Sequence, residues 1–129
     1  MKYILPLILL FTSSLYSQSR LGSSRSEIYS EFQSLSPEFG ATEDGTPTMS
    51  VMFGRSYTRY FFDDNNICNF VAIVPNRQGD LNYYVELYNK QYVVVSATAW
   101  KMYSKDGSIA TIELVTQSGV SMFVWTFER

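Results

Sequence analysis

The most informative segment of the sequence runs Ile67-Cys68-Asn69-Phe70-Val71-Ala72-Ile73-Val74 and ends at Pro75. Nearly every side chain in it is apolar, which is typical of a strand buried on both faces. The turn formers Asp63-Asp64-Asn65-Asn66 precede it and favour a hairpin, because Asn and Asp tolerate left-handed backbone and bond to their own main chain. The segment is therefore predicted to be a central strand, paired with Tyr57–Asp63.

A helix and then a strand are predicted on the N-terminal side of this hairpin. Ser24 and Glu27 have the spacing of a capping box, in which each side chain accepts from the other residue's backbone amide. An apolar stripe follows at helical spacing, formed by Ile28, Phe32 and Leu35. Pro37 ends the helix. Glu38–Pro47 is predicted to be a loop because it is rich in turn formers, and Met49–Phe53 alternates as a strand.

A second helix and further strands are predicted on the C-terminal side. Asp80 is expected to cap the helix, whose apolar stripe is Leu81, Tyr84, Val85 and Tyr88. Because Tyr and Val also favour strands, a strand over the same residues is the alternative. The strands that follow are expected at Tyr92–Val95, Ala99–Tyr103, Ser108–Thr116 and Val120–Glu128, with turns at Lys105-Asp106-Gly107 and Gln117-Ser118-Gly119.

Together these segments predict an α+β domain with a mainly antiparallel sheet of about six or seven strands, whose two short helices cover one face. The two helix-and-sheet passages echo each other in structure without repeating a sequence motif. The last strand is apolar on both faces, so we expect it either to be covered on both sides or to present a sticky surface.

The first residues have the pattern of a secretory signal. Lys2 is followed by the apolar run Tyr3–Phe11 and then by the small and polar stretch Thr12–Gln18. The run is half the length of a membrane-spanning helix, and no cysteine for a lipid anchor follows it. We therefore expect residues 1–17 to be a signal peptide and residues 18–129 to be one domain, exported to the periplasm or outside the cell without a stable membrane anchor.

The composition excludes several classes of function. The 129 residues include no histidine and one cysteine, so histidine-dependent triads and histidine–cysteine zinc sites are absent. The formal charge of −2 offers no basic footprint for nucleic acid. Asp63 and Asp64 lack the alternating ligands of a calcium loop and are interpreted as a solvated hairpin tip. We expect no cofactor, no metal and no catalytic residues.

Cys68 is predicted to be a small core residue, on the same strand face as Phe70, Ala72 and Val74. An intermolecular disulfide is the alternative, since an exported protein meets oxidising conditions.

The abundance of aromatic residues, 16% of the chain, is the one positive functional signal. Rigid aromatic side chains are enriched at binding hot spots. Tyr83 lies off the apolar stripe of the second helix and should face outward, and Trp100 and Tyr103 follow on the next strand. We take Tyr83, Trp100 and Tyr103 as candidate partner-binding residues, while core packing is the alternative for each ring.

Residues 24–75 resemble a module of small envelope proteins. The features concerned are the helix opening Ser24-x-x-Glu27, the loop Gly45-Thr46-Pro47 and the hairpin Tyr60-Phe61-Phe62-Asp63-Asp64-Asn65-Asn66-Ile67. They resemble the β-lactamase-inhibitor-protein-like fold and the small outer-membrane lipoprotein A family. The resemblance implies a non-catalytic protein that binds other envelope proteins. The chain lacks the anchoring cysteine of that lipoprotein family, and its leader followed by Gln18 is similar to small exported proteins of Bacteroidetes-type bacteria.

Two classes of function are therefore expected. The first is an exported, non-enzymatic module that binds an envelope or extracellular protein through a sheet face, a sheet edge or exposed tyrosines. The second is a carbohydrate or small-ligand binder, with Tyr83, Trp100 and Tyr103 lining a groove. The sequence leaves the oligomeric state open.

Overall fold

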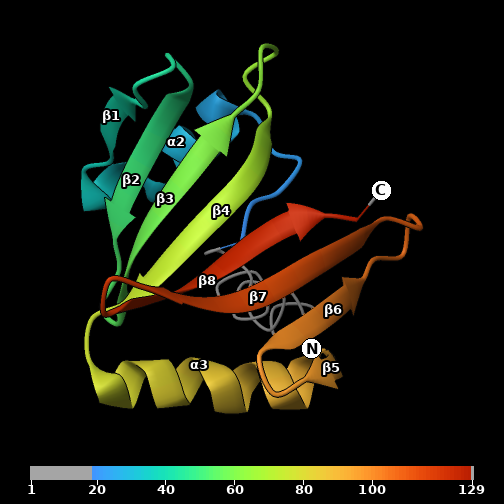
Figure 1. Ribbon diagram of the computed structural model, residues 1–129. Helices are drawn as coiled ribbons and strands as arrows, with labels where there is room; N and C mark the ends of the chain where they lie inside the picture. The colour runs from blue at the N-terminus through green and yellow to red at the C-terminus, as the bar shows by residue number, and fades with distance from the viewer. Residues whose placement is uncertain (1–18, 129) are drawn as a thin grey trace, which may run out of the picture.

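Eight antiparallel strands form one sheet in the order β1-β2-β3-β4-β8-β7-β6-β5 in a computed structural model that describes residues 19–128 (Figure 1). The strands are β1 (Glu38–Ala41), β2 (Pro47–Met52), β3 (Ser56–Phe62), β4 (Cys68–Pro75), β5 (Val93–Ser96), β6 (Ala99–Tyr103), β7 (Ile109–Gln117) and β8 (Val120–Phe127). The helices are α2 (Arg25–Phe32), the short 3₁₀ helix η1 (Gln33–Leu35) and α3 (Gln78–Gln91). The predicted α+β class is confirmed, but the strand count is eight rather than six or seven. The signal predicted at residues 1–17 lies outside the described residues.

The sheet consists of two similar halves. In each half one helix precedes four strands: α2 precedes β1 to β4, and α3 precedes β5 to β8. The halves meet where β4 pairs with β8, and Val71 faces Trp125 across that junction. The short, open strands β1 and β5 consequently form the two outer edges of the sheet (Figure 1).

The strand missing from the prediction is β1, which lies within the expected loop Glu38–Pro47. All four of its residues are exposed, so no burial pattern marks it in the sequence. The strand is stabilised by contacts with α2. The Phe39 ring stacks on Tyr29 of α2 at 5.4 Å, and the Arg25 guanidinium lies 4.9 Å from the centre of the same ring. Contacts with the neighbouring strand β2 and with α2, rather than local propensity, make this segment a strand.

The start of α2 follows the predicted capping box. The Ser24 hydroxyl accepts from the Glu27 amide at 3.2 Å, and the Glu27 carboxylate accepts from the Ser24 amide at 2.8 Å. Ile28 and Phe32 are buried, as the stripe predicts, whereas Leu35 is exposed. The α-helix ends at Phe32 and tightens into η1 just before Pro37.

The second predicted helix is α3, so the alternative of a strand is wrong. Tyr84 and Tyr88 are buried on its inner face. Asp80, however, is not the cap, because the helix begins earlier, at Gln78, with Arg77 as its N-cap residue. The Asp80 carboxylate is buried and accepts from Arg55 Nη1 and Arg77 Nε, each at 3.2 Å. This residue therefore ties the first turn of α3 to the turn between β2 and β3.

Strand β4 is central, as predicted, with β3 on one side and β8 on the other. The prediction that Cys68 shares a face with Phe70, Ala72 and Val74 is wrong. Phe62 faces Cys68 while the adjacent Phe61 faces Phe70, so a bulge at Asn69 turns those side chains to the opposite face. Cys68 itself lies fully buried on the helix-covered face, which confirms it as a core residue.

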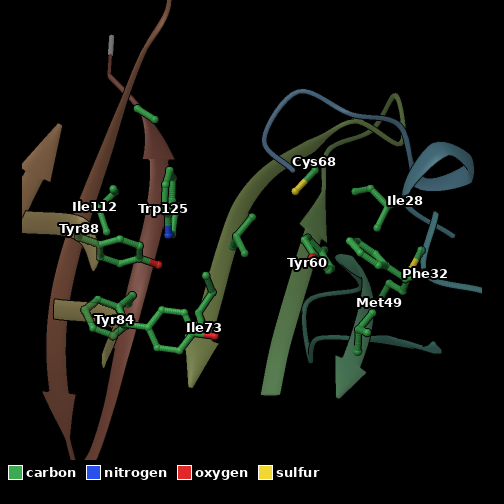
Figure 2. Close-up of a cluster of buried hydrophobic side chains, with 14 of the residues drawn as sticks. Ile28, Phe32, Met49, Tyr60, Cys68, Ile73, Tyr84, Tyr88, Ile112 and Trp125 are labelled. Atoms are coloured by element: carbon green, nitrogen blue, oxygen red, sulfur yellow. The ribbon is translucent and has the colours of Figure 1, made fainter. Parts of the chain in front are cut away.

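Both helices pack on the same face of the sheet. Phe32 of α2 stacks on Tyr60 at 6.3 Å, and Tyr88 of α3 meets Phe123 edge to face at 5.0 Å. Figure 2 shows the resulting core, with Ile28, Phe32 and Met49 toward α2 and with Tyr84, Tyr88 and Trp125 toward α3. Burial of these rings is the main stabilising contribution, since each removes a large apolar area from water.

Candidate binding surface

The three predicted binding aromatics do not share a surface. Trp100 is completely buried, and its indole Nε1 donates to Asn89 Oδ1 at 2.8 Å. Tyr83 is 37% exposed on α3, where the Arg55 guanidinium lies 4.0 Å from its ring centre. Tyr103 is 58% exposed at the end of β6. Within this set, only Tyr83 and Tyr103 can therefore touch a partner, and they lie on different elements.

The first groove is acidic and lies beside the loops β1–β2 and β3–β4. Its volume is about 750 Å³, its floor includes the edge-to-face pair Phe61 and Phe70, and its carboxylates are Glu43, Asp44, Asp63 and Asp64. Asp44 Oδ1 accepts from the Thr46 amide, and Asp63 Oδ1 accepts from the amides of Asn65 and Ile67. These two carboxylates hold their own loops, as predicted for the tip at Asp63. No cluster of three potential metal ligands occurs among the described residues.

The face of the sheet opposite the helices is partly apolar. Phe61 and Phe70 pair on it at 5.0 Å, and the Arg59 guanidinium lies 5.3 Å from the Phe61 ring centre. On β8, Met122 and Val124 are half-buried there because neighbouring strands shield them. The prediction of a strand with two apolar faces is thus confirmed, with one face under the helices and the other on this surface.

The second groove is basic and lies at the far edge of the sheet, where β5 begins. Its volume is about 650 Å³, and three lysines but no carboxylate line it: Lys90, Lys101 and Lys105. Tyr92, Val93 and Tyr103 contribute apolar surface to the same groove. Below we call it the lysine groove.

The three lysines differ in how far they are neutralised. Lys101 Nζ lies 2.5 Å from Glu128 Oε1, and this hydrogen-bonded pair raises the pKa of Lys101. Lys90 and Lys105 form no ion pair with any residue of the range 19–128. Two positive charges without an ion-pair partner in residues 19–128 therefore remain at the lysine groove.

Strand β5 forms the open edge beside this groove. One side of β5 pairs with β6, and no strand within the described chain pairs with its other side. Its three consecutive valines are each more than half exposed: Val93 at 53%, Val94 at 52% and Val95 at 56%. The edge carries no proline and no charged side chain, two of the devices that prevent pairing with another chain, but it is short and its register with β6 shifts at Val95.

The sequence alone did not single out this surface. The run Val93-Val94-Val95 predicts a strand, but a buried central strand has the same composition. The nearby lysines are scattered over sixteen positions of the chain and form no charge run. Only the order of the strands reveals that the valines lie at an edge and that the lysines converge beside it.

Comparisons with protein-family models, with curated proteins and with solved structures find no match. None of the helices in residues 19–128 is long and apolar enough to cross a membrane.

Proposed function

We propose that this protein is an exported, non-enzymatic protein-binding module of the cell envelope, and that it binds its partner by β-strand addition at β5. The observation that carries the proposal is the open edge with three exposed valines. Such an edge presents unpaired backbone groups to an incoming strand, and the valines add apolar contact. The resemblance of residues 24–75 to envelope-protein modules supports the same class of function.

The other edge strand does not offer an equivalent site. On β1, the Phe39 ring contacts Tyr29 and Arg25, although it remains 52% exposed. The strand also has Gly40 at its centre and begins with the charged Glu38. We therefore assign partner binding to β5 rather than to β1.

The test compares two substitutions at one position of β5. The register between β5 and β6 shifts at Val95, a position where proline is tolerated by a strand. Val95→Pro removes a backbone donor at the edge, whereas Val95→Thr retains it along with a β-branched side chain. The full chain, tagged at its C-terminus, is expressed in its own host and purified after mild cross-linking with each substitution.

We expect one stoichiometric partner with the natural chain and with Val95→Thr, and strong depletion of that partner with Val95→Pro. Circular dichroism of the purified variants checks that both remain folded. Equal recovery of the partner by all three chains would show that β5 is not the site and would contradict the proposal.

The alternative, a carbohydrate or small-ligand binder, retains support from one observation. The exposed Tyr103 and the partly buried Tyr92 line the same groove, and tyrosine faces can stack on sugar rings. Retention on a glycan array that is abolished by Tyr103→Ala, together with no stoichiometric protein partner, would favour this alternative.

A further inference from the structure

We infer that the segment captured by β5 is extended and apolar, and that acidic residues follow it on its C-terminal side. The inference rests on the proposed function and adds the chemistry and the direction of the partner. It follows from the position of the lysine groove relative to the open edge.

The direction of the partner follows from the sheet itself. All seven strand pairs between neighbours in this sheet are antiparallel. Antiparallel pairing is also slightly the more stable arrangement. A strand added to β5 in the same way runs from the Ser96 end toward the Val93 end, so its C-terminal residues leave the sheet beside Val93.

The lysine groove begins at the Val93 end. Val93 lines the groove and pairs with Lys101 of the neighbouring strand β6. Lys90 is in the last turn of α3, three residues before Val93, and Lys105 follows the end of β6. Residues that continue past Val93 therefore enter a groove with two unpaired positive charges and no carboxylate in its lining.

Charge complementarity selects an acidic continuation. Carboxylates in this groove would neutralise Lys90 and Lys105, whereas basic residues would add to an uncompensated positive field. The β5 valines supply apolar contact for the preceding part of the segment. The two parts of the surface thus recognise two successive parts of one chain.

A second copy of this protein fits the surface less well. If two β5 strands paired antiparallel about Val94, Ser96-Ala97-Thr98 of one copy would approach the lysine groove of the other. That stretch contains no acidic residue, so the lysines would remain uncompensated. We therefore assign the site to a different protein chain.

The test uses three fluorescent peptides of about ten residues, the length of a strand with a short tail. All share an alternating Thr-Val core, and they differ in the tail that follows it: Asp-Asp-Glu, Ser-Gly-Ser or Lys-Lys-Arg. Binding to the natural chain is measured by fluorescence anisotropy at about 50 mM and about 500 mM salt, because screening weakens contacts between exposed charges.

Three variants separate the contribution of the lysine charges to peptide affinity from the contribution of the open edge. Lys90→Gln combined with Lys105→Gln removes the two unpaired charges, and Val95→Pro weakens the edge. Arg25→Gln is the matched control, because it removes an exposed positive charge beside β1 at the opposite edge of the sheet.

We expect the acidic-tail peptide to bind about tenfold more tightly than the basic-tail peptide at low salt, and the difference to shrink at high salt. The double lysine variant should weaken acidic-tail binding roughly three- to tenfold, with no effect from Arg25→Gln. Val95→Pro should weaken binding of all three peptides.

Other outcomes would overturn the inference. Equal binding of all tails with loss in Val95→Pro would overturn the acidic preference and leave the proposed function intact. A dimer in sedimentation that Val95→Pro converts to monomer would assign β5 to a second copy. Binding of no peptide, with the partner still lost from Val95→Pro in the cross-linking experiment, would reject an extended acidic segment while retaining β5 as the site.

Discussion

The aromatic side chains of this protein lie both in the core and on the surface. Trp100 and Tyr103 lie three positions apart on β6, yet the first is fully buried and the second is more than half exposed. Alternation along a strand places neighbouring side chains on opposite faces. The aromatic content of the sequence therefore reflects core packing as well as contact surface.

This contrast predicts unequal effects on stability. Trp100→Phe removes a buried hydrogen bond to Asn89 and part of a core ring, so it should lower the free energy of unfolding by about 1–3 kcal/mol. Tyr103→Ala at the exposed end of β6 should change it by less than about 0.5 kcal/mol. Urea unfolding followed by circular dichroism measures both values. Similar losses from both substitutions would contradict the assignment of Trp100 to the core.

Cys68 should be inert in the folded protein. Burial raises the pKa of its thiol to about 12, so almost no thiolate exists near neutral pH. We expect negligible labelling by a disulfide reagent at about pH 8 in native buffer, and one thiol per chain after denaturation. Rapid labelling of the native chain would show that the thiol is accessible and would reopen the alternative of an intermolecular disulfide.

Among the elements, those with a strong local pattern were predicted correctly. The capping box of α2, the stripe of α3 and the glycine turn at Gly107, where φ is +91°, are all visible as patterns within a few residues of the sequence. Strand β1 and the bulge in β4 were missed because they depend on pairing with a neighbouring strand, not on a pattern within their own residues. Exposed β1 has no alternation to detect, and the bulge at Asn69 is visible only in the register with β3.

The capping box of α2 should make stability depend on acid pH. The backbone hydrogen bond from Ser24 lowers the pKa of Glu27 below its ordinary 4.5. A carboxylate with a lowered pKa in the folded state contributes stability above its ordinary value and loses it as the pH falls through the lowered value. Asp44 and Asp106 act in the same direction, because hydrogen bonds from Thr42 and Ser108 lower the pKa of each.

Thermal midpoints of the natural chain and of Glu27→Gln test this dependence between about pH 6 and about pH 2.5. We expect the natural chain to have the higher thermal midpoint at the upper end of this pH range. The difference between the two midpoints should narrow below pH 4.5 as Glu27 becomes protonated. A difference that is constant across the range would show that Glu27 does not contribute through its charge.

At the scale of the whole molecule, one sheet unites two similar halves. The pairing of β4 with β8 and the continuous core across it join the two halves, so we expect neither half to unfold alone. The order of the strands also creates the edge at β5, and no local pattern in the sequence encodes that order. The candidate surface therefore could not be predicted from the sequence, although its strand was predicted and its lysines are present in the sequence.

This continuity predicts a single cooperative unfolding transition. The two halves carry separate probes, since Cys68 lies in the α2 half and both tryptophans, Trp100 and Trp125, lie in the α3 half. Thiol exposure and tryptophan fluorescence should report the same denaturant midpoint. Two distinct midpoints would indicate halves that unfold independently.

The central claim is that β5 receives a strand from another protein. The most direct test is hydrogen–deuterium exchange. It is measured on the free protein and on its complex with the partner identified by cross-linking. We predict that the amides of residues 93–96 gain strong protection in the complex, while those of β1 and of the acidic groove do not change. Unchanged exchange at β5, with new protection elsewhere on the molecule, would contradict the claim.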